Sequence, residues 1–241
     1  MAWFETWFDS PYYPLLYKHR DSAEAEQLVS QITNQFPVTR FPRVLDAACG
    51  KGRHALSLAK KGYAVDAFDL APTSIAAAQN LVNDEVNLTF KVHNILDAYA
   101  FDQFDLVTNL FTSFGYFETE IDDMRALRAM HDALKPGGFL IQDFLNTHFV
   151  EADEAWKLQS IDGVAFETKK EIENNKVVKS IKVLDNGALF DFKETVSLFK
   201  LQDFERMYKA VGFKIEHVFG DYYFNQFNPD ISPRLIMIAS K

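Results

Sequence analysis

Apolar and polar residues follow two alternating patterns through the first 144 residues of this chain. Short continuous apolar runs predict buried strands, and apolar residues spaced three or four apart predict helices with one buried face. Strands that alternate with helices are typical of an α/β fold with a mostly parallel, Rossmann-like sheet. The predicted strands span residues 43–47, 63–68, 88–92, 104–110 and 138–144, and the predicted helices span 21–36, 53–61, 72–83 and about 121–134.

The ends of these helices carry their own signals. Asp21 is placed to cap the first helix, and Pro72 is acceptable in a first helical turn. The run Lys135-Pro136-Gly137-Gly138 predicts the end of the helix that precedes the fifth strand.

Residues 151–200 break the alternation. Asn-Gly is a strong hairpin signal, because both residues tolerate the positive φ of a type I′ turn. Ligands bind beyond the carboxyl ends of parallel strands, and this insert leaves from such an end. It is therefore expected either to cover the substrate mouth or to form a dimer ribbon away from it. Antiparallel strands are predicted at 164–172, 176–184 and 188–199, with turns at Asn174-Asn175 and Asn186-Gly187.

Residues 201–241 are predicted to complete the main sheet with a helix at 202–211 and strands at 213–219 and 234–239. The connector between these strands has no helical periodicity. A parallel return normally needs a helical crossover, so the last strand is predicted to run antiparallel. The result is a seven-stranded sheet, built from an N-terminal helix and core at 1–150 and from 201–241, plus a small antiparallel β insert at 151–200.

Composition narrows the class of protein. The 241 residues carry a formal net charge of −9 with no basic run, which disfavours a nucleic-acid partner. No apolar run approaches the roughly 20 residues of a membrane span, and residues 1–10 do not resemble a secretory signal. Cys49 is the only cysteine, so a reducing, cytoplasmic compartment is expected.

A glycine-rich turn between two strands carries the chemistry. Asp46 ends the first strand, Gly50 and Gly52 follow it, and Asp69 ends the second strand, as in a mononucleotide-binding βαβ unit. The segment 50–55 also fits the dinucleotide pattern G-x-G-x-x-A, so a nicotinamide-dependent oxidoreductase is an alternative. A pyrophosphate favours the bare positive end of a helix, whereas an acid at the turn suits an ammonium group or a cation.

Four segments together resemble the successive motifs of class I S-adenosylmethionine-dependent methyltransferases: 44–52, Asp69, 104–107 and 134–138. The resemblance covers about 43–144. Ala48 stands where the family most often has its first glycine, and its small side chain keeps the turn compact. The resemblance implies S-adenosylmethionine as cofactor and methyl transfer to an oxygen or nitrogen atom of a small molecule, by a monomer or homodimer. A non-catalytic protein that only binds this cofactor is a further alternative.

The resemblance also implies roles for single residues. Asp69 would hold the ribose, and Leu70 would pack on the adenine. Asn94, beside Ile95, stands where an aspartate usually accepts a hydrogen bond from the adenine amino group. The methionine portion would contact Asp46, the backbone around Ala48, Gly50 and Gly52, and a carbonyl oxygen at Asn109-Leu110.

The methionine carboxylate needs a cationic partner, for which Arg20 and Arg53 are candidates. The aromatic segment 12–17, which ends at Tyr17, is expected to fold over the cofactor pocket. No metal site is expected, because the six histidines show no ligand spacing with one another or with Cys49.

Residues that follow the carboxyl ends of the strands are candidates for binding the methyl acceptor. His148 is the predicted general base, since histidine titrates near neutrality. Tyr116 is the second catalytic candidate. Arg234 is expected to hold a substrate carboxylate or to pair with Asp221 or Asp230. The remaining candidates are Phe111, Ser113, Phe114, Phe117, Asn146, Tyr222 and Tyr223.

Overall fold

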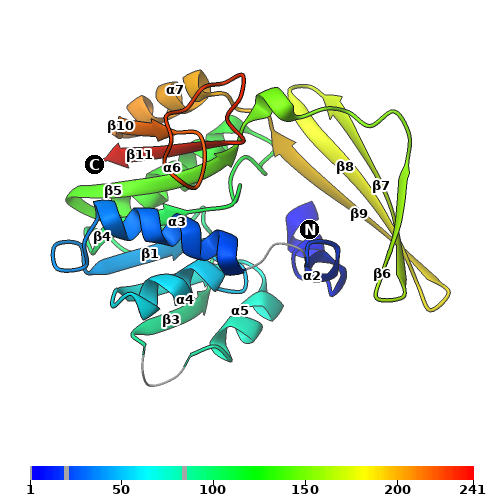
Figure 1. Cartoon of the computed structure of the whole chain (residues 1–241), viewed down its shortest axis with the longest axis horizontal. Helices are drawn as coiled ribbons and strands as arrows, with labels where there is room; N and C mark the ends of the chain where they lie inside the picture. Colours follow the sequence, from blue (N-terminus) through cyan, green and yellow to red (C-terminus); the bar gives the residue numbers. More distant parts are fainter. Residues whose placement is uncertain (1, 19–21, 83–85) are drawn as a thin grey trace.

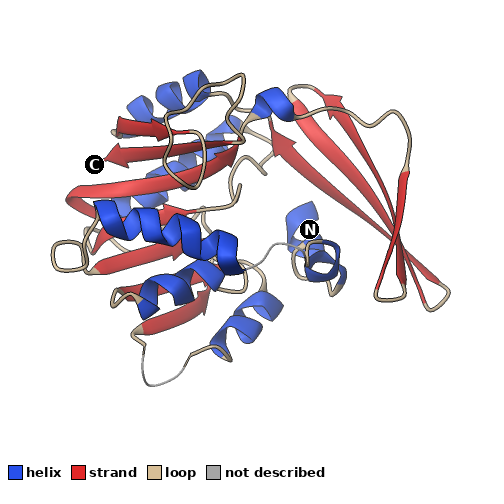
Figure 2. Ribbon diagram, viewed as in Figure 1, coloured by secondary structure: helices blue, strands red, loops and turns tan. Residues whose placement is uncertain are grey.

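The computed structural model describes residues 2–18, 22–82 and 86–241, which form two separate sheets (Figure 1). The predicted helix cap at Asp21 and the candidate ligand Arg20 lie outside the described residues. Helices flank the larger sheet, and the smaller sheet stands beside it (Figure 2).

The larger sheet has the strand order β10-β11-β5-β4-β1-β2-β3. Four pairings, β1 with β2 and β4, β2 with β3, and β4 with β5, are parallel. β11 runs antiparallel to both β5 and β10, as the non-helical connector predicted. The strands are β1 (Arg43–Ala47), β2 (Ala64–Asp69), β3 (Leu88–Val92), β4 (Phe104–Asn109), β5 (Leu134–Leu145), β10 (Lys214–Phe219) and β11 (Arg234–Ser240).

Two hydrophobic cores lie on opposite faces of this sheet, because successive strand residues point to opposite sides. Val44 packs with the core that includes Leu28 and Leu58, whereas its neighbour Leu45 packs with the core that includes Leu127 and Phe204. The helices that supply these cores are α3 (Ser22–Gln35), α4 (Arg53–Lys60), α5 (Pro72–Gln79), α6 (Glu120–Ala133) and α7 (Leu201–Val211).

β5 is longer than its predicted range. Helix α6 ends at Ala133, but the chain enters β5 immediately, where Leu134 pairs with Phe104 and Phe139 pairs with Leu106 after a register shift. The stop signal at 135–138 therefore lies inside an irregular strand start rather than in a loop.

The insert folds as a four-stranded antiparallel sheet of β6 (Lys157–Ile161), β7 (Val164–Glu173), β8 (Lys176–Asp185) and β9 (Ala188–Ser197). Both predicted turns hold two residues at positive φ. The edge strand β6 was not predicted, because most of its residues are exposed and it has no apolar run. Asp162 and Gly163, both at positive φ, form a turn before β7 that could have indicated it.

Two short N-terminal helices lie between the two sheets (Figure 1). They are α1 (Trp3–Trp7) and α2 (Tyr12–Leu16), and a short 3₁₀ turn, η1 (Thr147–Phe149), follows β5. Trp7, Tyr12 and Leu16 pack against Phe166 and Ile181 of the smaller sheet. Across the described ranges, every helix is too short or too polar to cross a bilayer.

Candidate functional site

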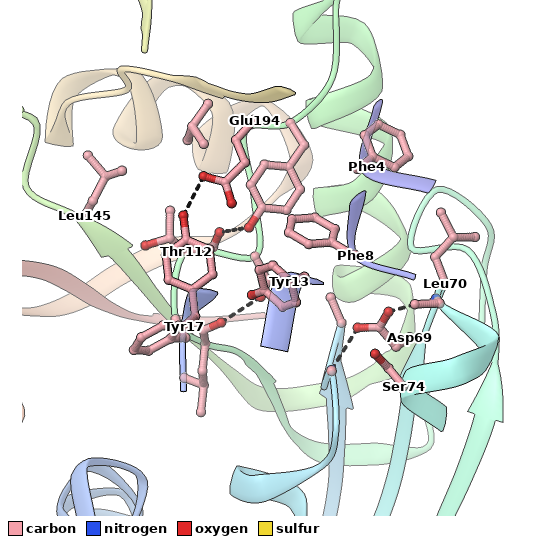
Figure 3. Close-up of a pocket in the computed structure, with 18 of the residues that line it drawn as sticks. Phe4, Phe8, Tyr13, Tyr17, Asp69, Leu70, Ser74, Thr112, Leu145 and Glu194 are labelled. Atoms are coloured by element: carbon pink, nitrogen blue, oxygen red, sulfur yellow. Dashed lines mark hydrogen bonds between the residues drawn. The ribbon is translucent and has the colours of Figure 1, made fainter. Parts of the chain in front are cut away.

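A cavity of about 1090 Å³ opens between the carboxyl ends of the main strands, the N-terminal helices and the smaller sheet (Figure 3). The turn after β1 lines one wall, and side chains of β7, β8 and β9 line another. Side chains of the insert therefore face the same cavity as the glycine turn.

The glycine turn brings bare backbone to this cavity. Ala48, Gly50 and Gly52 have φ values of 60°, 56° and 79°. A methyl group added at Gly50 would meet nothing within 4 Å, whereas one at Gly52 would clash with the Phe90 ring. Gly50 therefore keeps the backbone open to a ligand, while Gly52 allows the turn to pack on the core.

Asp69 connects the ends of β2 and β1 at the cavity wall. Its Oδ2 accepts a hydrogen bond from the Gly50 N–H at 2.8 Å, and its Oδ1 accepts one from the Ala71 N–H at 2.9 Å. Burial raises the pKa of this carboxyl, and the backbone hydrogen bonds oppose that shift. Each oxygen retains a lone pair for a further donor, such as a ribose hydroxyl.

Asp46 lies behind the turn and is only 1% exposed. Its Oδ1 accepts a hydrogen bond from the Thr108 hydroxyl at 2.7 Å, but its Oδ2 has no hydrogen-bond partner among the described residues. Burial raises its pKa to about 7, against the effect of the Thr108 hydroxyl. An unsatisfied buried acceptor beside an open backbone turn fits a ligand that brings an ammonium group.

Two asparagines have structural partners. Asn94 lines the cavity with Ile95, Leu70 and Leu110, but its Oδ1 already accepts a hydrogen bond from the Leu96 N–H at 3.0 Å. Asn109 is fully buried: its Nδ2 donates to the carbonyl oxygens of Ala47 and Ser113, and its Oδ1 accepts from Gln142. Asn109 therefore braces the end of β4, and its side chain does not reach the cavity.

Arg234 was expected to hold a substrate carboxylate or to pair with Asp221 or Asp230; it lines the cavity, and its ion pair is with another carboxylate, Asp143. Its Nε donates to Asp143 Oδ1 at 2.8 Å, across 91 residues of chain. The same carboxylate accepts hydrogen bonds from the Tyr222 hydroxyl and the Phe111 N–H. Asp143 was missed because it lies inside an apolar strand, where a carboxylate should itself have indicated a buried partner.

Residues 44–138 match the protein family described as "Methyltransferase domain". This match identifies residues 44–138 as a class I S-adenosylmethionine-dependent methyltransferase domain. The fold class and the cofactor predicted from the motifs are thereby confirmed, in preference to the nicotinamide alternative.

Known proteins resemble this methyltransferase over most of its length. "Putative methyltransferase YqeM" of Bacillus subtilis (strain 168) is 28% identical over 197 residues, which are 75% of this chain and 76% of that protein. The crystal structure of an S-adenosylmethionine-dependent methyltransferase from Clostridium acetobutylicum ATCC 824 is 20% identical, covers 95% of both chains and has a TM-score of 0.80. The amino pentose methyltransferase CalS10 of Micromonospora echinaspora is 22% identical, with 96% of this chain and 97% of that chain covered and a TM-score of 0.69.

The two catalytic candidates of the methyltransferase lie in different surroundings. Tyr116 lines the cavity, donates a hydrogen bond to the Thr112 carbonyl oxygen and packs against Trp3 and Phe8. His148 is not among the described lining residues. Its side chain is 53% exposed and lies 4.0 Å from Asp230. A general base must reach the acceptor, so this placement gives the His148 prediction no support.

Two predicted cofactor residues, Tyr17 and Arg53, line the cavity, and the insert strands add charged residues that were not predicted. Tyr17 lines the cavity as expected (Figure 3), but its hydroxyl donates to Glu194 Oε2 and accepts from Lys179 Nζ, each at 2.7 Å. Arg53 also lines the cavity, 4.3 Å above the Phe111 ring. Lys179 and Glu194 come from the insert strands β8 and β9, which the sequence predicted without assigning any of their residues to the site.

Two histidines, His54 and His93, line the cavity. His54 lines the cavity, but burial, aided by the charge of Arg53, lowers its pKa to about 3, so the ring is neutral. Within residues 2–18, 22–82 and 86–241, there is no cluster of three potential metal-ligating side chains.

Proposed function

We propose that the methyltransferase transfers its methyl group to a nitrogen or oxygen atom of a small molecule held between the glycine turn and the smaller sheet. The observation that carries this proposal is the shared cavity of about 1090 Å³, which cofactor-turn and insert residues line together. Ligand pockets usually measure about 300–1,000 Å³, so this one has room for a cofactor and an acceptor. CalS10, which is named as an amino pentose methyltransferase, supports an acceptor of similar size.

At the cofactor end, Asp46 Oδ2 would pair with the ammonium group and Asp69 with the ribose hydroxyls. Leu70, Asn94 and Ile95 would surround the adenine, because all three line the cavity on the Asp69 side. The open face at Gly50 would let the methionine portion approach the backbone. Ala48, Leu110, Tyr17 and Arg53, which also line the cavity, would complete the cofactor contacts. The proposed roles of Gly52 and Asn109 are indirect, through the shape of the turn and the end of β4.

Bound S-adenosylmethionine supplies a methyl group on a positively charged sulfur. The chain itself needs to align the acceptor with that carbon and to exclude water. Trp3, Phe8 and Tyr116 form an aromatic cluster at the cavity, with ring centroids 5.4–5.5 Å apart. Ring faces attract a cation, so these walls suit a sulfonium as well as an organic acceptor.

Calorimetry with S-adenosylhomocysteine tests the cofactor end. Asp69→Ala is expected to weaken binding about tenfold or more, as the loss of well-placed hydrogen bonds implies. Asp66→Ala is the matched control, because Asp66 lies three residues earlier on β2 and bonds to Thr89 and Tyr99 instead. Equal losses in both variants, or no binding by the unmodified protein, would count against the proposal.

Formation of S-adenosylhomocysteine in the presence of acceptor mixtures tests the substrate class. Turnover is expected with pools of small amines and alcohols and not with RNA or unfolded protein. Turnover only with a polymer would overturn the assignment to small molecules.

A further inference from the structure

We propose that Lys170 and Lys179 hold an anionic group of the methyl acceptor, a carboxylate or a phosphate, on the cavity face of the smaller sheet. This inference rests on the proposed function and names the substrate class for the same cavity. It depends on the register of the smaller sheet and on the distribution of charge around the cavity.

The two lysines are direct cross-strand neighbours. Lys170 of β7 pairs with Lys179 of β8, and Lys179 pairs in turn with Glu194 of β9. All three side chains line the cavity, so they form one row across the face that looks toward the glycine turn. Like charges directly opposite each other destabilise a sheet. Two lysines at facing positions beside a cavity therefore favour a negatively charged ligand.

The carboxylates on this wall are fewer than the lysines around them. Asp153 lies 2.6 Å from Lys157 Nζ and 3.8 Å from Lys170 Nζ, so one carboxylate serves two ammonium groups. Glu194 is also engaged, because its Oε1 accepts from the Trp7 indole N–H at 2.6 Å and its Oε2 accepts from the Tyr17 hydroxyl. On this wall, three lysines face two carboxylates.

The same imbalance holds for the whole cavity. Among the described residues that line it, seven are Lys or Arg and three are Asp or Glu, although the full chain has 25 basic and 34 acidic residues. The cofactor does not account for this excess, because its sulfonium and ammonium groups outnumber its single carboxylate. An anionic acceptor would complement both the lysine row and the sulfonium.

The aromatic cluster indicates that the acceptor also has an apolar part. Trp3, Phe8 and Tyr116 line the cavity together with the lysine row. Apolar and aromatic walls with a few convergent charges are typical of sites for organic ligands, where the charge orients the molecule. We therefore expect an organic anion rather than an inorganic ion alone.

Benzoate and inorganic phosphate are suitable probes, titrated by calorimetry into the full chain saturated with S-adenosylhomocysteine. Lys170→Gln and Lys179→Gln are each expected to weaken anion binding about tenfold, the loss expected for a charge-assisted hydrogen bond. Lys169→Gln is the matched control: Lys169 lies on the same strand, pairs with Glu171 at 3.0 Å and does not line the cavity. Lys170→Arg should retain binding.

The outcomes separate this inference from the proposed function. If S-adenosylhomocysteine fails to bind the unmodified protein, the proposed function fails. If it binds but neither probe does so saturably, or if Lys169→Gln weakens the probe as much as Lys170→Gln, only the anion site fails. Binding of benzoate alone assigns the site to carboxylates, and binding of phosphate alone assigns it to phosphates. Melting temperatures of the Gln variants that do not fall confirm that a loss of binding is local.

Discussion

The carboxylate of Asp69 accepts a hydrogen bond from the backbone N–H of Gly50 at 2.8 Å, across the carboxyl ends of two neighbouring parallel strands. This bond fixes the glycine turn and places the Asp69 oxygens at the cavity wall. The residue proposed to bind the cofactor ribose therefore also shapes the turn proposed to bind the methionine portion.

Substitutions at Gly50 and Gly52 should separate ligand access from packing. Gly50→Ala places a methyl group in open space at a φ of 56°, so about 1–2 kcal/mol of stability should be lost, while S-adenosylhomocysteine affinity should fall at least tenfold. Gly52→Ala drives a methyl group against the Phe90 ring, which should cost about 1–3 kcal/mol more. Urea unfolding and calorimetry measure the two effects. Unchanged affinity in Gly50→Ala would contradict the open-face role of Gly50.

Cofactor affinity should depend on the ionisation of Asp46. Burial raises the pKa of Asp46 to about 7, so the fraction that is charged, and able to pair with an ammonium group, grows as pH rises from 6 to 8. S-adenosylhomocysteine should bind more tightly over this range, by at most about tenfold per pH unit below the pKa. Asp46→Asn should flatten the profile. Calorimetry at pH 6, 7 and 8 tests this, and a profile of equal slope in the variant would rule out Asp46 as its source.

A second buried carboxyl should govern stability rather than binding. Asp123 of α6 is 1% exposed, and its Oδ1 has no hydrogen-bond partner within the described ranges. Burial raises its pKa from 3.8 to about 7, so between these values the native state binds more protons than the unfolded chain. Its contribution to the free energy of unfolding should therefore fall as pH rises, by at most about 1.4 kcal/mol per pH unit.

Asp123→Asn should remove that loss, so the variant should gain stability relative to the unmodified protein between pH 5 and pH 8. Urea unfolding at both values is the measurement. Asp123 does not line the cavity, so cofactor affinity should keep the pH profile set by Asp46. A variant that is less stable at pH 8 than at pH 5 by the same margin as the unmodified protein would show that another group is responsible.

Removing the Asp143 carboxylate should destabilise the fold more than removing an exposed carboxylate near the substrate end. Its side chain is fully buried and accepts a hydrogen bond from the Phe111 N–H, while its partner Arg234 donates to the Thr112 hydroxyl. Phe111 and Thr112 both have positive φ. Asp143→Ala leaves Arg234 partly buried without this partner and should cost about 3–5 kcal/mol. Asp230→Ala, at an exposed carboxylate 4.0 Å from His148, should cost less than about 0.5 kcal/mol. Similar unfolding midpoints for the two variants would contradict the role of Asp143.

Local patterns predicted most of the main sheet. Apolar runs and turn residues are encoded within a few neighbouring positions, so β1 to β4, the Asn186-Gly187 turn and the antiparallel β11 were found with small errors at their ends. The same information was insufficient for β6, whose residues are largely exposed, and for α1 and α2, which are five residues each and are stabilised by contacts with a sheet more than 150 residues away.

The sequence by itself indicated the cofactor class, because Asp46, the glycine turn and Asp69 lie in one βαβ unit that, with segments 104–107 and 134–138, resembles the methyltransferase motifs. Only the tertiary structure decided the acceptor side. Arg234 meets Asp143 across 91 residues, and Lys170 meets Lys179 only through the register of a hairpin. Such contacts depend on which strands pair and which faces they turn to the cavity, and these are properties of the packed chain rather than of any one segment.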